Sequence, residues 1–290
     1  TAYEIPKRDW SSDVCSSDLE AFRECGTRLR HAALALPSGS VIRKILHLPD
    51  DLSEEELEVQ VEADAADSLP FAIEELSVDF GIIGPSLAPG SMEVLLVAAR
   101  KEKIDERVSL VQAAGIRPLV VDVESQALIA AMTLGKAPAD SEKSEGAIAL
   151  LQLGRDASQF TIFNRNVVIF ERELGVGTYK VEQELSRHPE HASAAQEVFH
   201  KVICQEIKRA QQLYVNTAEH AEIDRLLRAG PAERLSRLPE IIGENLGLTS
   251  LLANPFRGMS ISPSVDQAAL HADASACLVA CGLAMSFAEA

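Results

Sequence analysis

Residues 147–180, AIALLQLGRDASQFTIFNRNVVIFERELGVGTYK, contain the pattern that decides the fold. Three runs rich in aliphatic and aromatic residues follow one another with short turns between them, which is typical of a meander of antiparallel strands. The third run ends in Gly-Val-Gly, and a helical pattern, TYKVEQELS, begins directly after it. The stretch therefore predicts three consecutive strands, the last of which leads into a helix through a glycine-rich turn.

Glycine-rich turns in and after this stretch are the candidate ligand-binding elements. LQLGRDAS (151–158) joins two predicted strands, ELGVGTYK (173–180) opens a helix, and RAGPAERL (228–235) joins a strand to a helix. Backbone amides in such turns can face a phosphate group. Glycine at the end of a strand is also an ordinary turn residue, so each turn taken alone is a weak indication of a ligand.

Strands and helices are also expected on both sides of the meander. The segments before it predict two strands within 31–48, a helix from the Ser53–Glu56 capping box to Pro70, strands within 73–83 and 92–100, a helix over 101–115, and a strand leading into a helix over 117–135. The segments after it predict a long helix over 194–217, a strand over 222–230, a helix over 233–247 and a closing helix. This order indicates an α/β or α+β protein without short tandem repeats.

A polar segment containing Pro, Gly and Ser, residues 136–146, is typical of a linker. We expect one domain over residues 20–135, a linker over 136–145 and a second domain over 146–290.

The first nineteen residues, TAYEIPKRDWSSDVCSSDL, show neither helical nor strand periodicity. Acids and serines interrupt any apolar run, so the segment does not fit a secretory signal, and its acids do not fit a mitochondrial presequence. Back-translation of residues 9–19 looks like a common sequencing adapter read in one frame. We interpret residues 1–19 as a non-native, adapter-derived segment, and we expect the natural part to start within the gene at about Glu20.

Composition and short motifs restrict the function further. The formal net charge of −17 argues against nucleic-acid binding, which usually needs basic patches. No window approaches the run of about twenty apolar residues that spans a bilayer, so we expect no transmembrane segment. The cysteines suggest neither a disulfide nor a metal site, so a reducing cytoplasm is the simplest compartment. Cys277 and Cys281 lie one helical turn apart among small residues, which favours packing over a metal site or a disulfide. The seven histidines show no metal-ligand spacing, and no Walker A, HExxH, GxSxG or CxxC motif occurs.

Several longer stretches carry a resemblance to a known family: LPDDLSEEELEVQVEADAADSLPFAIEELSVDFGIIGP (48–85), VLLVAARKEKIDERVSLVQAAGIRPLVVDVES (94–125), ANPFRGMSISPSV (253–265) and ACLVACGLAMSF (276–287). They closely resemble the PilM family of type IV pilus assembly proteins, which is actin-like and related to FtsA. The resemblance covers residues 30–290. The three glycine turns, for their part, resemble the phosphate and adenosine loops of actin-like ATPase folds.

The family resemblance implies an α/β, actin-like (ribonuclease H-like) two-domain fold with an inserted small α+β subdomain at about 41–122. The first base subdomain is expected to be incomplete, because residues 1–19 stand where the family has its first phosphate loop. A helix over 123–136 is expected to return to the first base, and the C-terminal helix is expected to pack back on the first domain.

The resemblance also implies a ligand and partners. ATP with Mg would lie between the two bases, close to Gln152, Gly154, Gly175, Gly177 and Gly230. The partner would be the cytoplasmic N-terminal peptide of PilN, in a groove near the inserted subdomain, and PilO, PilP and the pilus motor would be reached indirectly. The protein would then be cytoplasmic and peripheral to the inner membrane through its partner.

Two departures from the family pattern put nucleotide chemistry in question. Gln152 stands where the second phosphate loop usually has Asp, and a neutral amide supplies no charge for a hard cation. Ala229 stands before Gly230, where the adenosine loop usually has two adjacent glycines. We expect a scaffold without catalytic residues that has relaxed or lost hydrolysis.

Two other functions remain as alternatives. One is an actin-fold ATPase or a sugar-kinase-like enzyme, which would need a catalytic carboxylate. The other is an FtsA-like cell-division protein, which normally ends in a basic amphipathic helix, whereas this chain has no Lys or Arg after Arg257.

Overall fold

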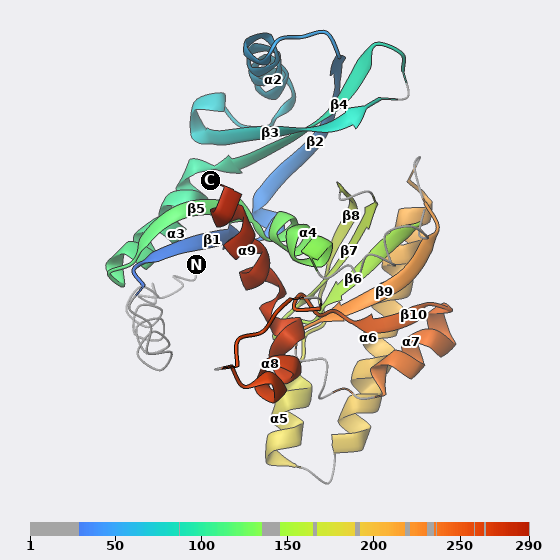
Figure 1. Ribbon diagram of the computed structural model, residues 1–290. Helices are drawn as coiled ribbons and strands as arrows, with labels where there is room; N and C mark the ends of the chain where they lie inside the picture. Colours follow the sequence, from blue (N-terminus) through green and yellow to red (C-terminus); the bar gives the residue numbers. More distant parts are fainter. Residues whose placement is uncertain are drawn as a thin grey trace, which may run out of the picture. The chain divides into compact units, whose positions relative to one another are not determined.

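The computed structural model describes residues 29–86, 88–134, 146–164, 167–188, 192–217, 221–230, 235, 237–257, 259–263 and 265–289. Contacts divide the chain into two compact units, Thr1–Glu124 with Glu289–Ala290, and Ser125–Ala288 (Figure 1). The interpretation of residues 1–19 and the linker at 136–145 lie outside the described residues. These units are defined by contacts within the chain and do not test the domain limits expected from the sequence, 20–135 and 146–290, which stay predictions.

The first unit contains a parallel pair of strands. β1 (His31–Leu36) pairs with β5 (Arg117–Val123), and α3 (Lys101–Ala113) packs on both. α3 reaches β5 through Gly115, whose φ of 77° lies in the left-handed region that favours glycine after a helix. Both strands and the helix lie within segments that the sequence predicts.

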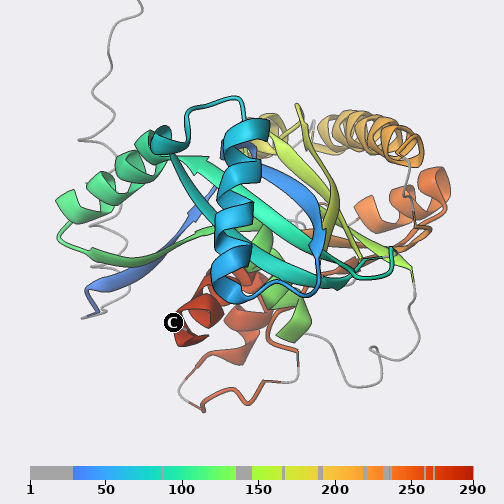
Figure 2. The same cartoon turned by 90° about the horizontal axis from the view of Figure 1, so that it is seen from above.

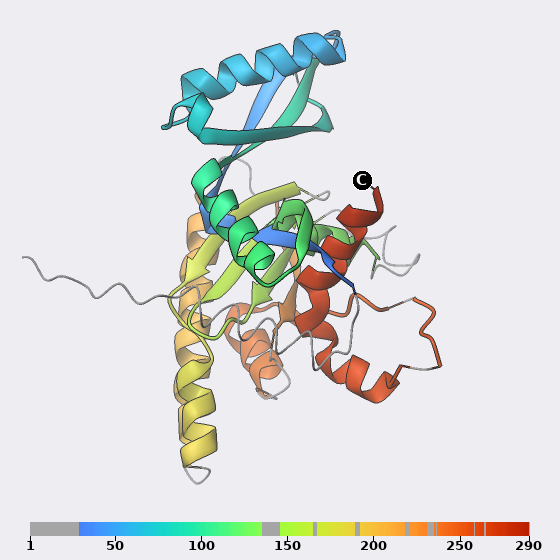
Figure 3. The same ribbon diagram turned by 90° about the vertical axis from the view of Figure 1, so that its left-hand side faces the viewer.

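Between β1 and α3 the chain forms a small α+β subdomain. β2 (Val41–Pro49), β4 (Ser91–Arg100) and β3 (Leu76–Pro85) make an antiparallel sheet in the order β2-β4-β3. α2 (Glu54–Ser68) lies across one face of this sheet, as Figures 2 and 3 show. Its buried residues Leu57, Val61 and Ala65 are spaced by four, as the helical pattern requires, and they pack on inward-facing residues of β2 and β4.

The predicted capping box at the start of α2 is confirmed. The Glu56 amide donates to Ser53 Oγ at 3.4 Å, and the Ser53 amide donates to Glu56 Oε2 at 2.9 Å. Each side chain thus satisfies an amide that has no partner in the first helical turn. α2 ends at Ser68, two residues before Pro70, as expected from the proline.

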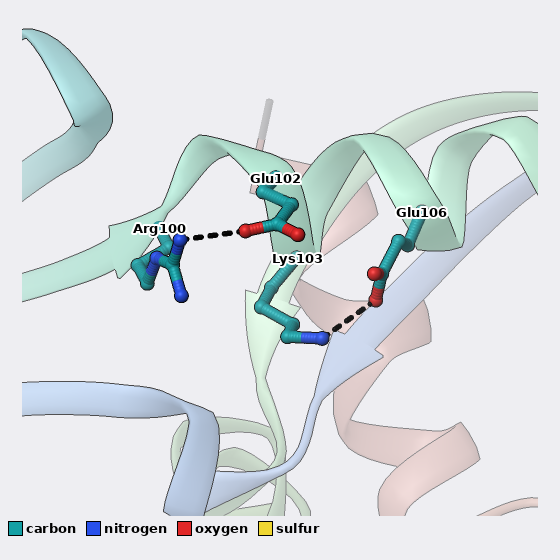
Figure 4. Close-up of polar contacts among 4 residues, drawn as sticks. All are labelled: Arg100, Glu102, Lys103 and Glu106. Carbon is teal, nitrogen blue, oxygen red and sulfur yellow. Dashed lines mark hydrogen bonds and ion pairs between the residues drawn. The ribbon is translucent and has the colours of Figure 1, made fainter. Parts of the chain in front are cut away.

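Polar contacts connect the start of α3 to the segment before β3. Arg100 pairs with Glu102 at 2.6 Å, and Lys103 pairs with Glu106 at 2.9 Å (Figure 4). All four side chains are about half exposed, so these ion pairs contribute little stability. Lys101 Nζ donates to the carbonyl of Glu74 at 2.8 Å, which fixes the adjoining segment more directly.

The second unit is built on a five-stranded sheet with the order β10-β9-β6-β7-β8. Its strands are β6 (Ala147–Gln152), β7 (Ser158–Asn164), β8 (Val167–Leu174), β9 (Ile223–Ala229) and β10 (Thr249–Leu252). The antiparallel neighbours β6, β7 and β8 confirm the predicted meander. β6, β9 and β10 run parallel. The sequence did not predict β10, because four residues carry too short a periodic pattern.

Helices cover both faces of this sheet (Figure 1). α5 (Tyr179–Arg187), α6 (Ala192–Val215) and α7 (Leu238–Leu246) pack on one face, and α4 (Glu124–Leu134) and α9 (Leu278–Glu289) pack on the other. β6 is buried on both sides, because Ala147, Ala149 and Leu151 face the first group while Ile148 and Leu150 face the second. A central strand covered on both faces reads as the continuous apolar run seen here.

The helix expected over 233–247 is described only as α7, which begins at Leu238. Pro239 occupies one of its first two positions, where proline is compatible with a helix start because its missing amide would have no partner. Residues 233, 234 and 236 lie outside the described residues. Gly247, with φ of 68°, ends the helix as predicted.

The closing segment forms α8 (Gln267–Asp273), a short 3-10 helix (Ala274–Cys277) and α9. Within the described part of the chain, the stretch Gln267–Met285 has the length and composition of a membrane span, with a mean hydropathy of 1.5, and 22% of it is buried. This stretch qualifies by length and composition alone, so the expected absence of a transmembrane segment stays a prediction. A Cβ at Gly282 would collide with the carbonyl of Ala127, so α9 lies directly against the backbone of α4.

Candidate functional site

The predicted ligand residues lie where parallel strands end. Gln152 is the last residue of β6, Gly154 lies in the turn after it, and Gly230 follows β9 directly. Because β6 and β9 are parallel neighbours, these residues share the carboxyl edge of the sheet. Open α/β sheets bind ligands outside this edge.

The turn after β6 and the turn before α5 are joined by backbone hydrogen bonds. The Thr178 amide and Oγ1 both donate to the carbonyl of Gly154, at 2.9 and 3.3 Å, and the Tyr179 amide donates to the carbonyl of Arg155 at 2.9 Å. Ser158 Oγ donates to the carbonyl of Val176 at 2.6 Å. The structure therefore brings Gly154 and Gly177 together although the sequence separates them.

Close packing against neighbouring backbone explains why glycine occupies both positions. A Cβ at Gly154 would fall within 3.0 Å of the carbonyl of Ala157, and one at Gly177 would lie 2.5 Å from the carbonyl carbon of Arg155. Gly175, two residues earlier, has nothing within 4 Å of its Cβ position. The space beside Gly154 and Gly177 is thus filled by backbone of the same unit.

Gly230 is explained in the same way. Its φ of 89° favours glycine, and a Cβ there would meet the carbonyl of Leu153. Its amide donates to the carbonyl of Ser275 at 3.3 Å, and Ser275 Oγ donates back to the Gly230 carbonyl at 2.8 Å. The amides of Thr178, Tyr179 and Gly230 are all used within the protein, so these three do not form a phosphate cradle.

Gln152 is half-buried, in register with Gln159 of β7 and Ala229 of β9. An amide at this position provides no anionic ligand for Mg. Among the residues that the structure describes, no group of three His, Cys, Asp or Glu side chains is placed to hold a metal ion. The residues around the β6 turn therefore do not fit a Mg-ATP site.

A cationic cavity of about 440 Å³ lies between α6 and α7. Its charged and polar lining comprises Glu197, His200, Lys201, Gln205, Lys208, Arg237 and Asn245. Three permanent cations against one acid are unusual in a chain of net charge −17. This cavity was not predicted from the sequence, although Lys201 and Lys208, two helical turns apart, place two cations on one side of α6.

His200 is the buried member of this lining. Burial lowers the pKa of its imidazole, the charge of Arg237 lowers this pKa further, and Glu197 opposes them. The imidazole therefore stays neutral at pH 7 and adds no charge to the cavity.

A second and larger hollow of about 710 Å³ lies between α5 and α6. Gly175, Val176 and Gly177 belong to its lining, and so do Arg155 and Tyr179, with the Arg155 guanidinium 4.7 Å from the centre of the Tyr179 ring. Most of the remaining lining is apolar, with small Ala194 and Ala195 on α6.

The chain is similar to known proteins over nearly all of its length. The family model described as type IV pilus assembly protein PilM matches residues 12–287. A solved PilM–PilN type IV pilus biogenesis complex is similar with a TM-score of 0.77 and 20% identity, covering 98% of this chain and 89% of that chain. The ethanolamine utilization protein EutJ from Carboxydothermus hydrogenoformans is similar with a TM-score of 0.50 and 12% identity, covering 95% and 74%.

These structural likenesses show the actin-like ATPase fold, confirming the fold class predicted from the sequence. The match of the family model, which spans nearly all of the chain, goes further. The chain belongs to the PilM family of type IV pilus assembly proteins.

Proposed function

We propose that the chain is a cytoplasmic scaffold that binds the N-terminal tail of PilN at the inner membrane. The observation that carries this proposal is the PilM family match over residues 12–287, together with a similar solved protein that is a complex with PilN. Through PilN, the scaffold would be linked to PilO, PilP and the pilus motor, and it would be peripheral to the membrane.

The face of the β2-β4-β3 sheet opposite α2 is the surface that we assign to the peptide. Leu46 and Val94 point toward α2, so their neighbours Ile45 and Leu95 point to the other side. Ile45 is 38% exposed, and Leu95 is half-buried. Among the described residues of this subdomain no helix covers the strip, and an open apolar strip of this kind suits the apolar side chains of a bound peptide.

Charge supports the same partner. Cytoplasmic segments next to a membrane helix carry an excess of Lys and Arg. The open face carries the acids Asp79 and Glu93 and one permanent cation, Arg43, which lies across Val97 from Asp79, and the chain as a whole has a net charge of −17. A basic tail is therefore attracted to this protein at long range.

Binding of a PilN N-terminal peptide to the purified chain, measured by fluorescence anisotropy, tests the proposal. Ile45→Asp should weaken binding at least about tenfold, because the loss of one buried Ile contact costs about 1.5 kcal/mol or more. Val59→Asp is the matched control, since Val59 is 69% exposed on α2. No binding by the unsubstituted chain contradicts the partner, and equal binding by both variants contradicts only the assigned face.

A second proposal concerns nucleotide. We infer that the chain binds ATP in the cationic cavity between α6 and α7, without Mg-assisted hydrolysis. The cations that line the cavity and the amide of Gln152 support this view.

Calorimetric titration with ATP should then show binding that Mg does not strengthen. Lys208→Ala should weaken this binding, whereas Lys180→Ala on α5, outside the cavity, should not. Steady phosphate release by the unsubstituted chain would instead support the alternative of an ATPase or a kinase-like enzyme.

A further inference from the structure

A small hollow of about 150 Å³ lies on the side of the five-stranded sheet that packs on α4 and α9. It reaches from the central strands to β10, and we name it the β10 hollow. A cavity of this volume with apolar walls can hold a group of the size of benzene, and therefore one Leu or Phe side chain. The apolar side chains that line it are Met132, Ile148, Phe163, Leu227, Leu251 and Leu278.

Two arginines add positive charge to the β10 hollow. Arg225 on β9 lies in register with Ile148 of β6 and therefore on the same side of the sheet. The Phe256 amide donates to Asn254 Oδ1 at 2.9 Å, in a turn after β10 that brings Arg257 to the hollow. The described residues of the lining include no Asp or Glu, although the whole chain has a net charge of −17. A guanidinium binds a carboxylate through two parallel hydrogen bonds, so this lining favours a carboxylate on an apolar group.

The edge of the sheet beside the hollow is suited to an extended peptide. β10 is the last strand on this side of the sheet among the residues that the structure describes. The Ala253 amide donates to the carbonyl of Arg228 on β9 at 2.8 Å. Because backbone groups alternate in direction along a strand, the amides and carbonyls of Ser250 and Leu252 point away from β9. Leu251 lines the hollow and is 47% exposed, so the edge and the hollow adjoin each other.

We propose that this corner of the second unit binds the carboxyl terminus of a partner protein whose last residue is apolar. The last residue of a chain carries its side chain and its carboxylate on the same Cα. One residue can therefore fill the β10 hollow and bind the guanidinium groups of Arg225 and Arg257. The preceding residues of the partner extend along β10. This site goes beyond the proposed binding of PilN, which uses an amino-terminal tail and the first unit.

Selection from a random hexapeptide library with free carboxyl ends, against the purified full chain, tests the proposal. We expect Leu, Ile or Phe to be enriched at the last position. The selected peptide, labelled with fluorescein at its amino end, should bind at least about tenfold more tightly as the free acid than as the amide in fluorescence anisotropy. A library without enrichment at the last position overturns the proposal, and so does an amide that binds as well as the acid.

Variants of the chain test the location of the site. Arg225→Gln and Leu251→Asp should each weaken binding of the selected peptide at least about tenfold. Arg209→Gln is the control for the first, because it removes the same charge from a 67% exposed side chain on α6. Leu213→Asp is the control for the second, because Leu213 is 45% exposed. Binding that Arg225→Gln and Leu251→Asp leave unchanged overturns the site. Arg257→Gln provides a further test of the carboxylate contact if Leu251→Asp does not fold.

Competition separates a protein terminus from a small organic acid of the same chemistry. Isocaproate has the side chain and the carboxylate of a terminal Leu but no peptide backbone. It should displace the labelled peptide only at concentrations at least about a hundredfold above those of the unlabelled peptide. Displacement at equal concentrations overturns the protein partner in favour of a small acid. A PilN N-terminal peptide should not compete, and competition by it would contradict a site separate from the one proposed for PilN.

Discussion

Gly177→Ala isolates the packing of the turn that precedes α5. The new Cβ would lie 2.5 Å from the carbonyl carbon of Arg155, below the 3.0 Å that real Cβ atoms keep, and this neighbour is backbone. Overpacking costs about 1–3 kcal/mol. Loss of glycine freedom in the unfolded chain offsets about 0.4–1 kcal/mol of this cost. The net loss in the free energy of unfolding is therefore about 1–2 kcal/mol.

Gly175→Ala is the matched control, two residues away in the same turn. Nothing lies within 4 Å of its Cβ position, so only the effect on the unfolded chain remains. We expect this variant to be unchanged or slightly stabilised.

The assay is thermal and urea unfolding followed by far-UV circular dichroism. At about 2–4 °C per kcal/mol, the Tm of the transition that involves Ser125–Ala288 should fall by about 2–8 °C in Gly177→Ala. A Gly177→Ala protein that melts within about 1 °C of the unsubstituted chain, or a Gly175→Ala protein that loses as much stability, refutes the packing argument.

Three further predictions concern stability. Ser53→Ala removes the cap of α2 and should lower the free energy of unfolding in urea by about 1 kcal/mol, whereas an unchanged midpoint contradicts the capping role. Ile203→Ala empties a fully buried position on α6 and should cost about 2–5 kcal/mol in the same assay; a loss below about 1 kcal/mol would contradict that burial. Burial lowers the pKa of His200 in the folded state, so His200 resists protonation there more than in the unfolded chain. Its neutral form therefore costs no stability above the ordinary pKa of about 6.5, and the free energy of unfolding should fall as the pH drops below that value. His200→Gln should reduce this pH dependence in urea titrations at pH 7 and pH 5.

The main elements could be predicted because local signals agree with tertiary burial. The capping box at Ser53 and Glu56 marks the start of α2, and residues spaced by four mark its buried face. The meander is readable because its strands are consecutive and its turns are short. β10 escaped prediction because Thr249–Leu252 is held by pairing with β9, a tertiary interaction that leaves no periodic pattern in four residues.

The site was less predictable than the fold, since glycine has two uses that look alike in a sequence. Gly154 and Gly177 could each leave room for a phosphate, but in the fold each makes room for a neighbouring backbone segment. The cavity between α6 and α7 was missed for a different reason. Lys208 and Arg237 are 29 residues apart, and only the packing of two helices brings them to one surface.

The central position of β6 has a consequence for synthesis of the chain. One edge of β6 pairs with β7, which follows within a few residues, but the other pairs with β9, where Ala149 meets Leu226, 77 residues later. At about 5–20 residues per second, the ribosome needs about 4–15 s to supply that second partner. During this time the apolar strand Ala147–Gln152 presents an unpaired edge, which other nascent chains can extend. We therefore expect the nascent chain to need chaperone protection mainly at this strand, until β9 has been synthesised.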